Sequence, residues 1–328
     1  MNNTKLSHGK PSTIPAAKHP PQIWAVASGK GGVGKSFVST NLGMALAQQG
    51  KKVVLVDLDF GSANIHTFLG LANPKTTLSS LLNQSSININ DLVEYTTKDN
   101  LGLISGAGDH LQMANLAHFQ KLKIMRNISQ IEADFVILDL GAGTSFNTLD
   151  FFLYADQALL TVIPEPTSIE NAYRLIKSLL SRQLKGLPEN TKEIINRILT
   201  EKQHKAPETQ TFASFLMDLQ FQCPEYANIM REHLKNIRLN LIVNQVREPA
   251  DSKLAVAMAV VSQKHFDIDL NVLGHLYHDN QVTHSLREKQ TYYHQYPQSK
   301  NVTSLNRIAV EMIAELASKH QSQTHTPS

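Results

Sequence analysis

One eight-residue segment limits the possible folds of this chain more than any other part of the sequence. It fits the phosphate-binding pattern G-x-x-x-x-G-K-[ST] and carries a second lysine directly after the first glycine. Its members are Gly29, Lys30, Gly31, Gly32, Val33, Gly34, Lys35 and Ser36. Glycines let the backbone wrap around a phosphate chain, and successive backbone N–H groups then point towards it. The segment therefore predicts a nucleoside triphosphate site, with Lys35 beside the β- and γ-phosphates and Ser36 on Mg²⁺.

The sequence on both sides of this loop has the order that such a site requires. Residues 23–28 form a short apolar run, which predicts a buried strand that enters the loop. After Ser36, apolar residues recur at helical spacing until Gly50, which predicts a helix that begins in the loop. A glycine-rich turn without a ligand is the alternative, and the agreement of strand, loop and helix argues against it.

Near-continuous apolar runs alternate with helical segments from residue 22 onward. Such runs are typical of strands covered on both faces, so we predict an α/β fold with a doubly wound, mostly parallel sheet flanked by helices. The predicted strands are 23–28, 53–57, 101–105, 135–140, 158–163, 239–244 and 271–276. A ligand should lie at their carboxyl ends, where Ser28, Asp57 and Asp139 fall.

The chain divides into three parts by composition. Residues 1–21 are rich in Pro, Lys, Ser and Asn without periodicity, and we expect them to form a disordered leader. Residues 22–320 are expected to form a single domain. Its last helix carries apolar residues on one face and charges that sum to zero, which favours packing on the core over binding to a membrane surface. Residues 321–328 are expected to be a flexible tail.

One part of the domain breaks the alternation of strands and helices. Residues 184–237 contain no strand-like run and predict a helical insertion. We expect helices near 189–203, 209–220 and 225–236, with Pro224 at the first position of the third. The insertion is either a surface for a partner or DNA, or a decoration of the kind that protein surfaces tolerate.

Composition excludes several classes of protein. The formal net charge is +3, from 31 basic and 28 acidic residues, and this near balance does not indicate a nucleic-acid-binding protein. Cys223 is the only cysteine, which excludes an internal disulfide and a multi-cysteine metal site within one chain. The sequence has no apolar run of about 18 residues and no secretory signal, so we expect a cytoplasmic protein.

Two further strand ends supply the carboxylates that a hydrolytic phosphate site needs. Asp139 follows four apolar residues, as in the Walker B pattern, and the glycines after it predict a turn that could sense a γ-phosphate. Asp57 ends another strand, and Asp59 lies two residues later. The alternatives are that Asp139 caps the next helix and that Asp57 only forms hydrogen bonds to its own loop.

At this point the chain resembles a known family. Residues 30–36 resemble the deviant Walker A box of the MinD/ParA ATPases, which have the P-loop NTPase fold. Residues 57–64 resemble their switch I, in the form found in the branch that regulates flagellar number (FlhG/FleN), and residues 139–143 resemble switch II. Residues 243–247 and 273–282 resemble the segments that lie near the adenine base. The resemblance covers about 22–183 and 238–318.

The resemblance implies an ATP-dependent homodimer in which two protomers enclose two ATP molecules. Lys30 would reach the phosphates of the nucleotide bound to the other protomer, so that the nucleotide sets the oligomeric state. Lys35 would clamp the β- and γ-phosphates, and Ser36 would bind Mg²⁺. Asp139 would hold Mg²⁺ through water, and Asp59 would orient the attacking water.

The resemblance also places residues around the base and reveals departures from the family pattern. Asn244 would read adenine, and Asp279 would lie beside it. Phe37 completes the ATP-binding segment, but the family usually has a small polar residue there. His66 stands where switch I commonly carries Asp, and the proline expected before Asp279 is absent. The basic amphipathic helix that takes MinD to membranes and the glutamine-containing activator helix of FlhG are both missing.

Two functions fit these residues best. The first is a slow, partner-stimulated ATPase switch that binds ATP or ADP with Mg²⁺, dimerises on ATP and positions or counts a cellular structure of flagellar or polar type. Its cargo and its protein activator are not identified by the sequence, and it would act in the cytoplasm or peripherally at the membrane or nucleoid. The alternative is a ParA-like partition ATPase that binds DNA non-specifically in its ATP state.

Two other classes share the deviant loop. Iron–sulfur carriers related to nitrogenase reductase need cysteine ligands, and Cys223 alone, within the insertion, does not supply them. Bacterial tyrosine autokinases carry C-terminal tyrosines, and Tyr292, Tyr293 and Tyr296 cluster here. Packing of these aromatic side chains near the base site is the preferred interpretation.

Overall fold

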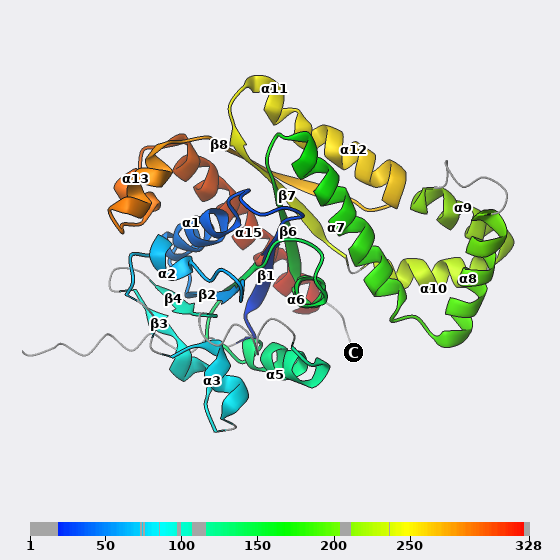
Figure 1. Cartoon of the computed structure of the whole chain (residues 1–328), viewed down its shortest axis with the longest axis horizontal. Helices are drawn as coiled ribbons and strands as arrows, with labels where there is room; N and C mark the ends of the chain where they lie inside the picture. Colours follow the sequence, from blue (N-terminus) through cyan, green and yellow to red (C-terminus); the bar gives the residue numbers. More distant parts are fainter. Residues whose placement is uncertain are drawn as a thin grey trace, which may run out of the picture.

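The fold is built around one eight-stranded sheet, seen in a computed structural model of the chain (Figure 1). The structure describes residues 19–324, apart from 73, 75, 85, 97–99, 107–115, 204–210 and 236. The strands are β1 (Gln22–Ala27), β2 (Val53–Leu58), β3 (Glu94–Tyr95), β4 (Leu101–Ile104), β5 (Phe135–Leu140), β6 (Gln157–Val162), β7 (Leu239–Val246) and β8 (Leu270–Tyr277). Their order across the sheet is β3-β4-β2-β5-β1-β6-β7-β8.

All seven predicted strands form, and they pair in parallel as expected. The sequence did not predict β3, a two-residue strand that pairs antiparallel with β4 at one edge of the sheet. Strand β1 lies between β5 and β6. The chain runs from β1 to β2 on one side of β1, and later crosses from β5 to β6 on the other side, so the strand order reverses at β1. Ligands bind at such a point in open α/β sheets, and the phosphate-binding segment follows β1 directly.

Helices cover both faces of the sheet, because apolar side chains of each strand alternate between two cores. Trp24 and Val26 of β1 point into one core, whereas Ile23 and Ala25 point into the other. The first core contains residues of α1 (Lys35–Gln48), α2 (Ile65–Phe68), α13 (Gln281–Arg287), α14 (Tyr292–Gln295) and α15 (Lys300–Thr324). The second contains residues of α3 (Leu78–Asn83), the 3-10 helix η1 (Ile89–Leu92), α5 (His118–Ile128), α6 (Phe146–Tyr154), α7 (Pro166–Leu184) and α12 (Leu254–Phe266). The short helix α11 (Pro249–Ser252) follows β7.

The predicted insertion is helical and lies at one side of the molecule, away from most of the sheet (Figure 1). It consists of α8 (Glu189–Gln203), α9 (Phe212–Gln222) and α10 (Pro224–Leu234), and Pro224 opens α10 as expected. The insertion has a small core of its own, which includes Phe215, Leu219 and Met230. The predicted break around Pro207 lies outside the described residues.

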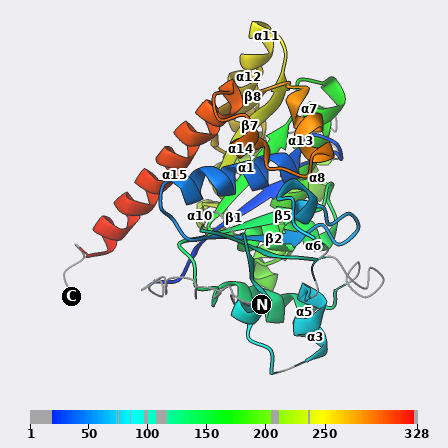
Figure 2. The ribbon, with the colours of Figure 1, turned by 90° about the vertical axis from the view of Figure 1, so that its left-hand side faces the viewer.

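The two ends of the chain only partly test the predicted boundaries. Residues 1–18 of the expected leader and residues 325–328 of the expected tail lie outside the described residues. Helix α15 packs on the core through residues such as Leu305 and Ile308, as predicted. The helix is assigned to Thr324, and the predicted boundary between domain and tail at 320/321 stays a prediction. Figure 2 shows the C-terminal half of α15 running out beyond the other elements.

Candidate functional site

The phosphate-binding segment forms a tight loop between β1 and α1. Gly34 lies in the left-handed region with φ 89° directly before α1, and a Cβ there would come within 2.3 Å of the Asn244 amide nitrogen. A Cβ on Gly29 would come within 2.1 Å of the Asn171 carbonyl oxygen in α7. Only glycine fits these two positions. Gly34 is needed for its left-handed backbone, and Gly29 is needed because α7 approaches its backbone closely.

Two glycines of the loop have open space beside them. A Cβ built on Gly31 or Gly32 meets nothing within 4 Å, so that side of the backbone is open. The loop leads into the N-terminus of α1, whose first-turn N–H groups have no partner within the helix and favour an anion. Lys35, which is only 8% exposed, begins that helix. Buried lysine beside open backbone N–H groups is the donor set that a triphosphate requires.

Asp139 lies at the carboxyl end of β5 and contacts helix α1 through two serines. Ser36 Oγ donates to one carboxylate oxygen at 2.6 Å, and Ser39 Oγ donates to the other at 2.8 Å. Burial raises the pKa of Asp139 above its usual value, although the two serine hydrogen bonds and the charge of Lys35 oppose this rise. A hydroxyl and a buried carboxylate in contact are oxygen ligands that suit Mg²⁺, so Ser36 and Asp139 could hold the ion.

Asp57 is directly opposite Asp139 in the parallel pairing of β2 with β5. Its two carboxylate oxygens accept hydrogen bonds from the backbone N–H groups of Asp59 and Ile65, at 3.1 and 3.2 Å. Burial, together with the nearby charge of Asp139, raises the pKa of Asp57 to about 8. Asp57 therefore holds its own loop through two backbone hydrogen bonds, and these contacts do not test a further role at the phosphates.

Asp59 faces the turn after β5 across a cavity of about 220 Å³. Gly61, Gly141 and Ser145 also line this cavity, so it lies between the segments that resemble switch I and switch II. A Cβ on Gly141 would be 3.6 Å from the Asp59 carboxylate, which shows how closely the two segments approach. A carboxylate facing a small cavity can orient a water molecule, the role expected for Asp59.

The two lysines of the loop lie in different environments. Lys35 is buried, whereas the side chain of Lys30 is 37% exposed at the rim of the site. Lys30 Nζ pairs with the carboxylate of Glu165 at 2.8 Å and donates to Thr167 Oγ1 at 3.1 Å. Both partners belong to the segment that begins α7. Lys30 is thus a surface cation with a partner in its own chain.

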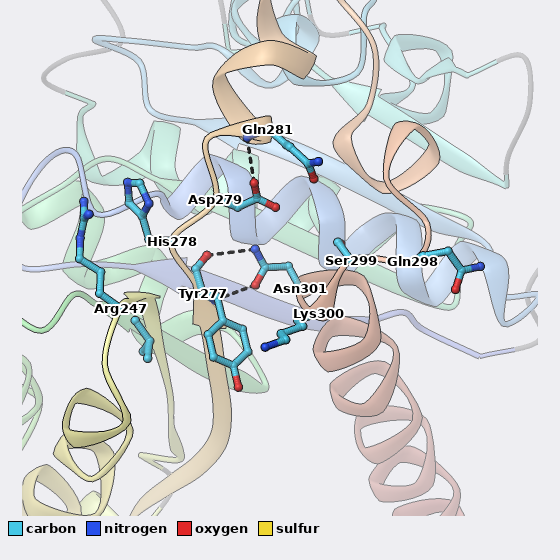
Figure 3. Close-up of a pocket in the computed structure, with 10 residues that line it drawn as sticks. Arg247, Tyr277, His278, Asp279, Gln281, Gln298, Ser299, Lys300 and Asn301 are labelled. Atoms are coloured by element: carbon cyan, nitrogen blue, oxygen red, sulfur yellow. Dashed lines mark hydrogen bonds between the residues drawn. The ribbon is translucent and has the colours of Figure 1, made fainter.

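The residues expected near the base lie in two places. Asn244 is buried and donates to the Val33 carbonyl oxygen at 2.8 Å, so its amide supports the phosphate loop. Asp279 lines a cavity of about 590 Å³ beside Arg247 and Asn301 (Figure 3). Asp279 also accepts a hydrogen bond from Tyr292 Oη at 2.7 Å. The cavity lies at the carboxyl ends of β7 and β8, and Asn244 does not line it, so the residues expected near the base do not share one cavity.

The side chain of Phe37 does not face the phosphate loop, in line with the departure from the family pattern noted at this position. It is 4% exposed in the core and packs edge-on against Tyr292, with ring centroids 5.1 Å apart. Only the backbone N–H of Phe37, in the first turn of α1, remains to contact a ligand. The tyrosines of this region therefore pack near the base site, as preferred from the sequence.

Several residues of the site were not found from the sequence. Ser39 lies one helical turn after Lys35 and could have been found by helical spacing, because it shares the face that reaches β5. Glu165 and Thr167 carry no motif and reach the loop only through the strand order. Gln245 lies in the segment 243–247, which resembles the family's adenine-contacting stretch, but its contact with the loop was not predicted: Gln245 Nε2 donates to the Gly32 carbonyl oxygen at 3.4 Å. In the described residues, no group of three or more His, Cys, Asp or Glu could hold a metal ion.

Comparison with known proteins agrees with this geometry. The family model of the CobQ/CobB/MinD/ParA nucleotide-binding domain matches residues 24–292. The antiactivator FleN of Pseudomonas aeruginosa is 26% identical over 294 residues, which cover 89% of this chain and 86% of FleN. The septum site-determining protein MinD of Helicobacter pylori is 33% identical over 182 residues, covering 55% of this chain and 68% of that protein.

Solved structures share the fold. The septum site-determining protein MinD from Pyrococcus horikoshii, complexed with Mg-ADP, superimposes with a TM-score of 0.61 at 20% identity, over 90% of this chain and 97% of that one. MinD of Aquifex aeolicus in complex with MinC gives a TM-score of 0.59 at 19% identity, over 89% of this chain and 96% of that one. The match of the family model extends over more than half of the sequence and includes every residue of the phosphate loop. The chain therefore belongs to the CobQ/CobB/MinD/ParA family of nucleotide-binding ATPases.

Proposed function

We propose that the chain is a slow ATPase switch that dimerises when it binds ATP and thereby positions or counts a cellular structure of flagellar or polar type. One observation supports this most directly: the phosphate loop carries a buried lysine, Lys35, and an exposed lysine, Lys30, at its rim. The buried lysine serves the nucleotide of its own chain. The exposed lysine is free to reach the nucleotide of a second chain once its contact with Glu165 is released.

Each residue of the site would have a separate role in binding and hydrolysing ATP. Mg²⁺, when bound with ATP, neutralises charge on the phosphates. Ser36 and Asp139 would hold this ion, and Lys35 would fix the phosphate chain as a point charge. Asp59 would orient the attacking water from the cavity between the two switch segments. Asp57 would keep the Asp59 segment in place through its two backbone hydrogen bonds.

Light scattering on purified protein tests the dimer. With Mg-ATP and the Asp59→Ala change to slow hydrolysis, we expect a dimer, and with Mg-ADP a monomer. The double variant Lys30→Ala/Asp59→Ala should bind a fluorescent ATP analogue but remain a monomer, whereas Lys35→Ala/Asp59→Ala should lose binding. An oligomeric state that does not change with nucleotide contradicts the proposal.

The cellular role is supported by the similarity to FleN, which spans most of both chains. The test is the number and position of flagella per cell, counted by electron microscopy after deletion of the gene. A change restored by the wild-type gene, but not by Lys35→Ala, supports the flagellar role. Unchanged flagella with unequal inheritance of DNA, together with an ATP-dependent and salt-sensitive gel shift of DNA, would favour the partition alternative instead.

The location of the protein follows from this role. Within the described residues, the structure has no helix with the length and apolar character needed to cross a bilayer. We propose that the protein acts in the cytoplasm, or peripherally at a membrane or the nucleoid, and that a protein activator stimulates its hydrolysis. Addition of that activator should raise ATP turnover only in the wild type, and not in Asp59→Ala.

A further inference from the structure

A surface formed by α5, α6 and the end of α7 exposes apolar side chains around a cavity. It consists of His118, Phe119, Leu122, Phe146, Arg182 and Lys185, and we call it the α5–α7 surface. Phe119 is 70% exposed, Phe146 62% and Leu122 37%. A cavity of about 280 Å³, lined by His118, Leu122 and Arg182 among others, lies beside Phe146, whose ring contacts Arg182. Exposed apolar side chains beside a cavity are typical of interaction sites.

The charges of the α5–α7 surface are mostly positive. The Arg182 guanidinium carbon lies 5.2 Å from the centre of the Phe146 ring, and Lys185 Nζ lies 5.7 Å from it. Helix α5 carries Lys121, Lys123 and Arg126 but no acidic residue, and α6 carries one acidic residue, Asp150. Lys185 is exposed and accessible to a carboxylate, whereas the Arg182 side chain is 29% exposed.

Asp150, the one carboxylate on α6, lines the cavity and is already paired with two cations of the same chain. Arg182 donates to both oxygens of Asp150, from Nε at 2.6 Å and from Nη2 at 3.0 Å, and Lys121 pairs with the same group. This arrangement fixes the orientation of Arg182 and leaves a surplus of positive charge around the cavity. The surface is therefore ordered in advance, which lowers the cost of binding.

Helix α6 connects this surface with the nucleotide site. Its N-cap Ser145 accepts a hydrogen bond from the Thr148 N–H, and both residues line the cavity that contains Asp59. Phe146 follows Ser145 directly, and Asp150 lies one turn later, on the side of the second cavity. Helix α6 therefore extends from the cavity that contains Asp59 to the cavity that contains Asp150.

We propose that the α5–α7 surface binds an acidic amphipathic segment of a partner protein. An apolar side chain of this segment would enter the cavity, and its carboxylates would pair with Arg182 and Lys185. The leader of the same chain does not fit, because residues 1–18 contain three lysines and no Asp or Glu. An anionic membrane would satisfy the rings and the cations, but it would leave a side-chain-sized cavity unfilled.

Fluorescence anisotropy with labelled peptides tests this proposal without nucleotide, so the result is independent of the proposed ATPase cycle. The probe is a helical peptide of about four turns with Leu and Phe on one face and Glu on the other. A twin peptide has Lys in place of Glu. We expect the full-length protein to bind the acidic peptide at least about tenfold more tightly than the basic twin, with the difference reduced by salt.

Matched variants locate the binding site. Phe146→Ala/Lys185→Glu should weaken binding of the acidic peptide about tenfold or more. Phe221→Ala/Lys264→Glu, which removes an exposed ring and an exposed lysine elsewhere, should leave it unchanged. Equal binding of the two peptides, or equal loss in both variants, overturns the proposal. So does binding to phosphatidylglycerol vesicles that Phe146→Ala/Lys185→Glu abolishes, or a change in oligomeric state caused by that variant alone.

Discussion

At the residue scale, Gly34 links the phosphate loop to the opposite half of the sheet. It combines a left-handed backbone with close contact to Asn244, whose amide also binds the Val33 carbonyl. We expect Gly34→Ala to lower the free energy of unfolding by about 1–3 kcal/mol, because the backbone becomes strained and Asn244 must move. Nucleotide affinity should fall about tenfold or more, since the displaced amide no longer supports the loop.

The control for this change is Gly50→Ala. Gly50 has a similar φ of 78°, but a Cβ there meets nothing within 4 Å. Gly50→Ala should therefore show the backbone strain alone, about 1 kcal/mol, with unchanged nucleotide affinity. Urea unfolding and titration with a fluorescent nucleotide measure both quantities. Equal nucleotide affinity in the two variants would contradict the role assigned to Asn244.

A second prediction at this scale concerns Asp150 and pH. Burial raises the pKa of Asp150, but hydrogen bonds from Arg182 and Lys121, together with their charges, outweigh burial and leave the pKa below its usual value. A lowered pKa stabilises the fold above the unfolded value of about 4, and this contribution is lost as the pH falls through the folded pKa. We expect Asp150→Asn to cost about 2–3 kcal/mol at pH 7, because it leaves Lys121 buried without its partner.

Urea unfolding at neutral pH and near pH 3 checks this prediction. The difference between wild type and Asp150→Asn should shrink at the lower pH, where the wild-type carboxylate is becoming protonated as well. Glu189→Gln is the control, since Glu189 forms an exposed pair with Lys192, and we expect it to cost less than about 1 kcal/mol. If the difference in unfolding free energy between wild type and Asp150→Asn stays constant with pH, the loss of stability comes from the changed shape of the side chain and not from its charge.

At the scale of the elements, the helical insertion should behave as a separate unit because it has its own core. Leu219 is fully buried there, among residues of α8, α9 and α10. We expect Leu219→Ala to cost about 2–5 kcal/mol within the insertion. Amide hydrogen exchange should accelerate in these three helices, while the strands and nucleotide binding stay unchanged. Leu55→Ala in β2 is the control and should accelerate exchange across the sheet.

The elements also show what the sequence can predict. Long apolar runs such as 135–140 identify strands well, because burial on both faces leaves few other structures. Strand β3 was missed because two residues are too few to show a period, and neighbouring β4 alone stabilises them. The packing of the Phe37 side chain could not be predicted for a related reason. A position in a motif does not reveal that Tyr292, more than two hundred residues later, supplies an aromatic partner.

At the scale of the whole molecule, the strand order determines which residues meet at the site. The sequence predicts that parallel strands bring Ser28, Asp57 and Asp139 to the same edge, and the structure confirms this. The sequence does not predict that β6 lies beside β1, so it gives no reason to expect Glu165 next to Lys30. Local patterns thus identify the loop and its carboxylates, but contacts made through strand order need the folded chain.

The contact between Lys30 and Glu165 leads to a prediction about assembly, which rests on the proposed dimer. In a single chain this ion pair holds Lys30 beside its own α7, so Lys30 must leave Glu165 to reach a second chain. An exposed pair of this kind contributes about 0–1 kcal/mol. Because both protomers lose this pair on dimerisation, Glu165→Gln in the Asp59→Ala background should lower the concentration at which the ATP-dependent dimer forms by up to about thirtyfold. Glu170→Gln is the control, because it breaks an exposed pair with Arg174 on the same helix without touching Lys30. Sedimentation at several protein concentrations measures the dissociation constant of the dimer. A weaker dimer in Glu165→Gln would contradict the prediction and would mean that Glu165 stabilises the dimer interface.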